Sequence, residues 1–170
     1  MLGRTRITGW VGAAIAVLGL AVITIGIFFV TQGVTARAEV QEAMAAEQVT
    51  VTIDEVAVPV VDQETAMAMA EVITGHTLGR YGPWQGMERT DPNRATMLDG
   101  LTLRNSLMLG RMALDVSDMV MGLGAVLGLI GVGFTAIGAA VMVLAGAAAR
   151  EETAETTAPN EFTPEYEQAA

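Results

Sequence analysis

The stretch "MVMGLGAVLGLIGVGFTAIGAAVMVLAGAAA", residues 119–149, contains no charged residue and is long enough to cross a lipid bilayer. An α-helix needs about 20 apolar residues to span a hydrocarbon core that is roughly 30 Å thick. A second uncharged run covers residues 7–36. Two such runs predict an all-α membrane protein whose two transmembrane helices pack as an antiparallel hairpin.

The rest of the sequence divides around these two runs. We predict a cytoplasmic segment at 1–8, transmembrane helices at 9–33 and 118–149, a small, mostly helical extracytoplasmic cap with stalks at 34–117, and a cytoplasmic tail at 150–170. The tail is acidic, rich in threonine and poor in aliphatic residues, a composition that is typical of disorder.

The arginines predict the orientation of the hairpin. Arg4 and Arg6 precede the first run and Arg150 follows the second, which places both ends of the hairpin in the cytoplasm. The six arginines between the runs weigh little, because long loops are translocated largely regardless of charge. All nine basic residues are arginine, which together with the many Ala, Gly and Val residues indicates a GC-rich genome, such as an actinobacterial one. We therefore predict a bacterial cytoplasmic (inner) membrane protein.

A cleaved signal peptide is the alternative to the first span. "ARAE", residues 36–39, contains an Ala-x-Ala motif after an apolar stretch that basic residues precede. The apolar core of a signal peptide has about 7–15 residues, and this one exceeds 20. An uncleaved anchor is the favoured interpretation, and a mature protein that starts at Glu39 would exclude it.

Composition excludes several function classes. The net charge of −10 disfavours nucleic acid as a partner, because such binding depends on basic residues that neutralise phosphates. The absence of cysteine excludes disulfides and thiolate metal sites. His76 is the single histidine, too few for a two-histidine iron site or a typical zinc site. We predict no cofactor and no catalytic residues, with lipid and other integral membrane subunits as partners.

Small residues recur along both predicted spans at steps of three and four or of seven. Such spacing lets a second helix approach closely, although glycine is also simply frequent in membrane helices. The predicted seam residues are Gly12, Ala16, Gly19 and Gly26 in the first span and Gly124, Gly128, Gly131, Thr135 and Gly138 in the second. We expect these two seams to pack on each other.

Four charged residues precede or begin the second span. Arg104, Arg111, Asp115 and Asp118 fall on one narrow helical face at 100° per residue. Arg111 and Asp115 form an i,i+4 pair. One interpretation is a solvated stripe at the headgroup level, and the other is a contact face for the opposite charges of a partner.

Between the spans, the pattern alternates between helix and extended signals. Residues 34–48 are strong helix formers, residues 49–60 show β-branched alternation typical of an extended segment, and Asp62 is a plausible N-cap for a following helix. Residues 79–92 are rich in Gly and Pro and predict a loop. A further helix is expected from about residue 92 through the second span.

The tail contains two threonines that are flanked by acidic residues, Thr156 and Thr157. A kinase could phosphorylate them, and the added charge would be readable by a recognition domain. A purely solubilising tail is the simpler interpretation.

The segments "VTVTIDE", "AEVITGHTLGRYG", "DPNRATML" and "LRNSLMLGRMAL" between two apolar runs resemble a family of two-span, mostly actinobacterial membrane proteins. The resemblance covers about residues 8–148 and implies the two-span architecture. Members are often labelled as aromatic-ring-opening dioxygenases. That chemistry needs several His and carboxylate ligands, and this chain has one histidine.

Three hypotheses for function follow. The first is a non-catalytic accessory or structural subunit of a larger membrane complex, for which a respiratory or other energy-converting assembly is a candidate. The second is an envelope sensor or signalling adaptor with a phosphorylatable tail. The third is an enzyme or transporter in its own right, which is disfavoured because two spans enclose no pathway and neither contains an internal ionisable residue.

Overall fold

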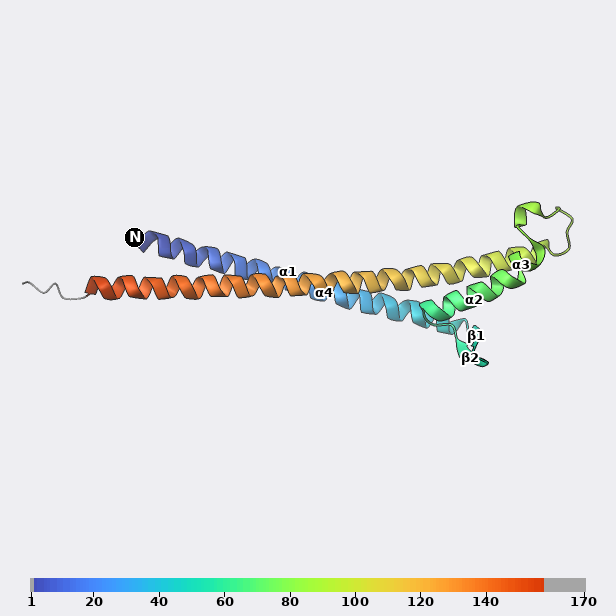
Figure 1. Cartoon of the computed structure of the whole chain (residues 1–170), viewed down its shortest axis with the longest axis horizontal. Helices are drawn as coiled ribbons and strands as arrows, with labels where there is room; N and C mark the ends of the chain where they lie inside the picture. Colours follow the sequence, from blue (N-terminus) through green and yellow to red (C-terminus); the bar gives the residue numbers. More distant parts are fainter. Residues whose placement is uncertain (1, 158–170) are drawn as a thin grey trace, which may run out of the picture. The chain divides into compact units, whose positions relative to one another are not determined.

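The computed structural model describes residues 2–157, which are mostly helical (Figure 1). The elements in chain order are α1 (Leu2–Ala46), β1 (Thr50–Ile53), β2 (Val56–Pro59), α2 (Gln63–His76), α3 (Leu78–Tyr81), the 3-10 turn η1 (Trp84–Gly86) and α4 (Arg94–Thr157). Both α1 and α4 are long and apolar enough to cross a membrane. The prediction of two long apolar helices is therefore confirmed.

The described residues form two compact units. The first contains α1 up to Thr24 and α4 from Gly128 onward, and the second contains Ile25–Leu127. Within the first unit, α4 stays helical to Thr157, so the beginning of the predicted disordered tail is helix. Its sequence after Ala147 is rich in Ala and Glu, which are strong helix formers. The remainder of that tail, 158–170, lies outside the described residues.

In the second unit, α1 ends in a left-handed turn. Gln48 adopts a φ of 52°, and the amides of Glu47 and Gln48 donate to the carbonyls of Met44 and Ala45. A left-handed residue just past the last helical turn reverses the chain and satisfies carbonyls that the helix leaves free. The chain thereby leaves the helix axis and enters the β-hairpin.

The segment predicted as extended is a two-stranded antiparallel hairpin. Ile53 pairs with Val56, and the two residues between them, Asp54 and Glu55, have φ values of 48° and 67°. Two successive positive φ angles are characteristic of the tight turns that suit the twist of a two-residue hairpin. The β-branched alternation identified the strands, but Asp-Glu is an unusual pair for such a turn and did not reveal it.

Asp62 caps the N-terminus of α2, as predicted. Its carboxylate accepts hydrogen bonds from the Thr65 amide at 2.8 Å and the Thr65 hydroxyl at 2.7 Å. The same hydroxyl accepts from the Asp62 amide at 3.2 Å, which completes a capping box. The first amides of a helix lack partners inside it, so this reciprocal pair fixes where α2 begins.

The opposite end of α2 packs closely on α4. The hydroxyl of the buried Thr77 donates to the Ile73 carbonyl at 2.6 Å, and the Thr77 methyl group lies against Gly100. A Cβ on Gly100 would collide with that methyl group. Gly100 therefore lets α2 approach α4.

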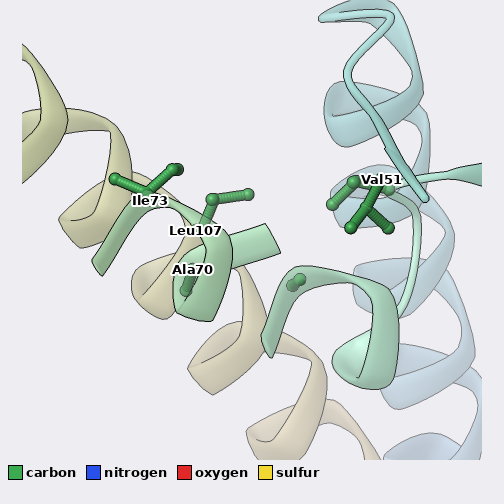
Figure 2. Packing of buried hydrophobic residues seen from close by; sticks show 6 residues of the cluster. Val51, Ala70, Ile73 and Leu107 are labelled. Atoms are coloured by element: carbon green, nitrogen blue, oxygen red, sulfur yellow. The ribbon is translucent and has the colours of Figure 1, made fainter. Parts of the chain in front are cut away.

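The apolar core of the second unit is built by the hairpin, α2 and α4, with the end of α1 packed against it (Figure 2). Its buried members are Val51, Val60, Ala66, Ala70, Ile73 and Leu107. Met44 of α1 packs against this cluster. This core packs the hairpin and α2, which together we call the cap, against the parts of α1 and α4 that belong to the same unit.

Candidate functional site: helix seams and a polar junction

In the first unit, α1 and α4 touch through glycine. A Cβ built on Gly131 would lie 2.7 Å from the Gly19 carbonyl oxygen, and one on Gly138 would lie 2.6 Å from that of Gly12. Carbon atoms do not approach so closely, so the two backbones are in direct contact. Partner numbers fall in α4 as they rise in α1, so these two segments run antiparallel within the unit.

Ala16 and Thr135 flank these contacts, as predicted. The Ala16 backbone lies beside Gly138, and the Thr135 side chain lies beside Gly19. The Thr135 hydroxyl donates to the Gly131 carbonyl at 2.8 Å, so its polar group is satisfied within its own helix. Lipid offers no hydrogen bonds, and this arrangement suits a residue of a membrane span.

Gly128 differs from the seam glycines, because a side chain there would not meet α1. A Cβ there would have no atom within 4 Å. At about 100° per residue, seven steps return to within about 20° of the starting direction, whereas four steps turn about 40° to one side. A residue four steps from a seam glycine can contact the opposite helix through its backbone, as the Thr135 amide does beside Gly19, while its Cβ is directed to one side.

The second unit contains its own part of the seam. A Cβ on Gly124 would lie 2.6 Å from the Gly26 carbonyl oxygen, and one on Gly33 would lie 3.0 Å from that of Ser117. Ser117 is buried, and its hydroxyl donates to the Ala113 carbonyl at 2.9 Å. Both Gly33 and Ser117 were missed in the sequence.

A repeat of seven could have revealed them. The buried small residues of α1 are Gly12, Gly19, Gly26 and Gly33, and those of α4 are Ser117, Gly124, Gly131, Gly138 and Ala145. Every step in both sets is seven residues. Such a repeat keeps one face of a helix aligned with a partner when the two wind gently around each other.

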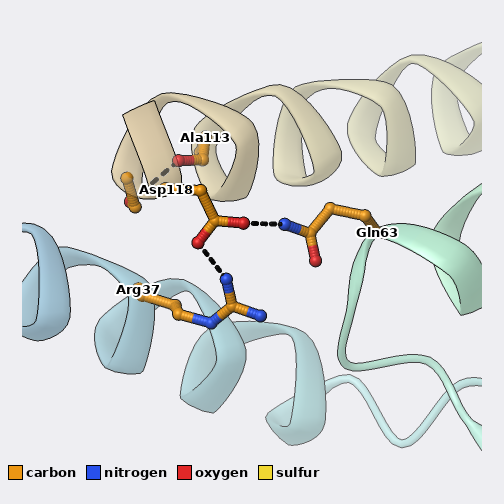
Figure 3. Close-up of polar contacts among 5 residues, drawn as sticks. Arg37, Gln63, Ala113 and Asp118 are labelled. Carbon is orange, nitrogen blue, oxygen red and sulfur yellow. Dashed lines mark hydrogen bonds and ion pairs between the residues drawn. The ribbon is translucent and has the colours of Figure 1, made fainter. Parts of the chain in front are cut away.

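A polar junction joins three helices of the second unit (Figure 3). Asp118 of α4 forms an ion pair with Arg37 of α1 through Oδ1 and accepts a hydrogen bond from Gln63 of α2 through Oδ2 at 2.7 Å. The side chains of Arg37 and Asp118 are 30% and 43% exposed. The junction therefore ties the base of the cap to both long helices while water still reaches it.

Asp118 is one of the four charged residues that were predicted to share a helical face. The other three do not take part in this junction. Arg111 donates to the Met67 sulfur of α2 at 3.1 Å, and its Nε lies 3.7 Å from the Asp115 carboxylate. Within residues 2–157, the side chain of Arg104 makes no hydrogen bond or ion pair. Two of the four charges, Asp118 and Arg111, are thus engaged with other helices of the same unit, and Asp115 pairs within α4.

The capping residue Asp62 lies beside this junction. Hydrogen bonds from the Thr65 amide and hydroxyl hold the pKa of the Asp62 carboxyl below its usual value, and the positive charge of Arg37 adds a smaller effect in the same direction. Asp62 therefore stays ionised at neutral pH and contributes a fixed negative charge next to Gln63.

A mostly apolar pocket of about 220 Å³ lies at the base of the cap. It is lined by Met44, Glu47, Val49, Val60, Leu103, Ser106 and Leu107. Its walls come from α1, the hairpin and α4, all within the second unit. The pocket could hold a small apolar molecule, and Glu47 and Ser106 supply its polar atoms.

The chemical groups of the described residues do not assemble into a metal site. Within residues 2–157, no three His, Asp or Glu side chains are grouped so that they could hold an ion. His76 is exposed in the last turn of α2. The backbone of Thr156 and Thr157 lies in the final turn of α4.

Comparison with known protein families, curated proteins and solved structures found no match to this chain.

Proposed function

We propose that this chain is a two-span protein of the bacterial cytoplasmic membrane and a non-catalytic accessory subunit of a larger membrane complex. The proposed hairpin crosses the bilayer with residues 9–33 and 118–149, has the cap outside and keeps both ends of the hairpin in the cytoplasm. Arg4, Arg6 and Arg150 support this orientation through the charge bias of cytoplasmic loops.

The single observation that carries the proposal is how the two apolar helices use their faces. The small residues turn toward the other helix, while the large apolar residues turn away from it. Among the exposed side chains are Trp10, Val17 and Phe28 of α1 and Leu129, Val143 and Leu144 of α4. An outward surface of this kind suits lipid and the helices of neighbouring subunits.

The polar groups at the membrane boundary support a structural function. Arg37 and Gln63 both bind Asp118, so these contacts hold the cap on the helices. A conducting or catalytic site would need ionisable groups directed into a cavity or a water path. The Arg37–Asp118 pair instead lies at a junction of three helices, where it fixes their relative positions within the second unit.

Purification of the full chain from its native membrane in a mild detergent tests the proposal. We expect stoichiometric integral membrane companions that remain bound through size-exclusion chromatography. An unrelated two-span protein with the same tag, purified in parallel, controls for detergent carry-over. Recovery of the chain without any companion protein would refute the proposal.

The pocket at the base of the cap supports a second candidate, an envelope sensor whose cap binds a small apolar ligand. Its signal would pass to the cytoplasmic segment that contains Thr156 and Thr157. Deletion of residues 151–170 separates the two functions. An accessory subunit should still assemble with its companions, whereas a sensor should lose its output.

A further inference from the structure

Large apolar side chains form an exposed stripe along α4 in the second unit. Leu109 and Met112 expose 60% and 57% of their surface, more than most apolar side chains in a folded protein. The stripe consists of Leu98, Leu109, Met112, Val116, Met119, Leu123 and Val126. None of these residues belongs to the apolar core or to the glycine seam.

The spacing of the stripe is that of a coiled coil. With Thr102 and Asn105 included, its positions advance alternately by four and three residues from 98 to 126. This is the repeat that places a and d residues of a heptad on one seam. The residues that pack on α1 and α2, such as Leu107 and Ser117, lie on roughly the opposite side of α4, at about 100° per residue.

Lipid does not cover the upper part of this stripe if the proposed membrane topology is correct, and the inference rests on that topology. Residues 94–117 of α4 then lie outside the bilayer and extend for about 36 Å at 1.5 Å per residue. Leu98, Leu109, Met112 and Val116 would all face water there. A row of exposed large apolar side chains on one face of a helix in water indicates a surface that another chain covers.

We propose that a second copy of this chain covers the stripe, so that two α4 helices form a parallel, two-stranded coiled coil. Two copies inserted in one membrane have the same orientation, and symmetric pairing through α4 is therefore parallel. Each copy supplies the same heptad repeat over the same length and in the same register.

Asn105 identifies the occupant most specifically. It is a polar residue at a d position, which would be buried by any helix that covers the stripe. In a symmetric parallel pair, each Asn105 faces its counterpart, and an amide that both donates and accepts can satisfy its own copy. A different partner would have to supply a matching polar group at that one layer.

The available area also matches a stable pair. Specific interfaces bury roughly 1,000 Å² or more in total. Seven large side chains from each copy, most of them at least half exposed, supply surface of this order. The arrangement leaves Arg104, Arg111 and Asp118 to one side of the contact, where they keep their places beside α2 and α1.

Single-cysteine cross-linking in native membranes tests the proposal, because the chain has no cysteine of its own. Asn105→Cys, Leu109→Cys, Met112→Cys and Val116→Cys should each give a covalent dimer of twice the chain mass under mild oxidation. Leu103→Cys is the matched control, since it is exposed on α4 at similar depth but lies on the flank that lines the pocket. It should label with a maleimide equally well and stay monomeric.

The pattern of cross-links decides between the alternatives. Four positions that span about 16 Å can each meet their own counterpart only in a parallel, in-register pair. An additional Leu109→Glu and Met112→Glu exchange should reduce the Val116→Cys dimer to the level of Leu103→Cys while maleimide labelling persists. Equal dimer at Leu103→Cys, no dimer along the stripe, or an adduct that contains one copy and another protein would overturn the proposal. The readout is independent of companion proteins, so a dimer without companions would refute the accessory-subunit proposal alone.

Discussion

The contacts that stabilise the first unit differ from those that build the cap in the second unit. In the first unit, Gly131 and Gly138 of α4 meet Gly19 and Gly12 of α1 backbone to backbone. In the second unit, side chains of the hairpin, α2 and α4 form an apolar core. The difference matches the proposed surroundings. Lipid provides no hydrophobic drive between helices, so close packing must supply the attraction, whereas a cap in water gains stability by burying side chains.

Polar groups show the same contrast. Thr135 of the first unit bonds to a carbonyl of its own helix, which is the arrangement that lipid requires. In the second unit, Asp118 bonds to side chains of two other helices and keeps partial contact with water. Substitutions should therefore be tolerated by different criteria in the two units, namely side-chain volume in the first and burial in the second.

The largest effect is expected where volume is added to the glycine seam. Gly131→Leu would force apart backbones that already exclude a Cβ at 2.7 Å, and we expect a loss of at least about 3 kcal/mol. The measurement is the amount of chain in the membrane together with its thermal stability in detergent. Loss of protein should accompany the lower midpoint, because poorly packed membrane proteins are degraded.

Gly128→Leu is the matched control for that substitution. A side chain at Gly128 would enter open space, so its abundance and midpoint should stay near those of the wild type. Equal damage from both substitutions would mean that volume anywhere on this helix is harmful. The seam would then have no special role in the first unit.

Removal of volume from the core of the second unit should have the next largest effect. Ile73→Ala leaves a cavity among buried side chains of the cap and should cost about 2–5 kcal/mol. Its neighbour Val72 is 41% exposed, so Val72→Ala should change stability by less than about 0.5 kcal/mol. Protection of cap amides from hydrogen exchange is the measurement. Similar loss of protection in both variants would contradict the core as described.

The capping box should contribute less, and its contribution should depend on pH. Asp62→Ala removes the acceptor for the Thr65 amide and should cost about 1 kcal/mol at neutral pH. The pKa of folded Asp62 lies below its usual value of 3.8, so ionised Asp62 stabilises the fold above that pH. This contribution should be lost as the pH falls from about 3.8 through the lower pKa of folded Asp62. The reason is that a protonated carboxyl is a poor acceptor for the Thr65 amide.

Comparison of wild type with Asp62→Ala from pH 7 to pH 2 checks the sign. The gap in stability should be constant near neutral pH and close in acid. Thr65→Val removes the other side chain of the box and leaves a carboxylate, so it separates capping from general acid unfolding. A gap that widens in acid would contradict the lowered pKa.

The sequence predicted elements whose cause is local. Charge-free length predicted both long helices, and Asp62 predicted the start of α2, because each signal lies within one segment. The sequence missed the turn at Asp54 and Glu55, where two uncommon residues adopt positive φ. It also missed Gly33, because steps of three and four conceal the repeat of seven until the partner helix is known.

The polar junction could be predicted only in half. Asp118 was identified as a charge at the start of a span, but its partners Arg37 and Gln63 are 81 and 55 residues away in sequence. Their meeting depends on how α1, α2 and α4 fold together. Charge periodicity along a single helix therefore suggested an outward face, whereas the fold turns Asp118 toward α1 and α2.

The smallest effect is expected at this junction, and it distinguishes a tie between helices from an ordinary surface pair. Asp118→Ala removes both the ion pair with Arg37 and the hydrogen bond from Gln63, and we expect a loss of about 1 kcal/mol or less, since both charges are partly exposed. Asp115→Ala is the control, because Asp115 pairs with Arg111 of its own helix, at 3.7 Å.

A double-mutant cycle between Arg37→Ala and Asp118→Ala should give a coupling of roughly 0.5–1 kcal/mol, against about 0.3 kcal/mol for Arg111 with Asp115. Salt should weaken both couplings. We expect smaller values at about 0.5 M than at about 0.05 M, because the Debye length is about 10 Å at 0.1 M and shortens as salt is added. Hydrogen exchange should place the effect of Asp118→Ala at the base of the cap, where α2 begins, and that of Asp115→Ala within α4. A coupling near zero for Arg37 with Asp118 would show that the apolar core alone holds the cap on its helices.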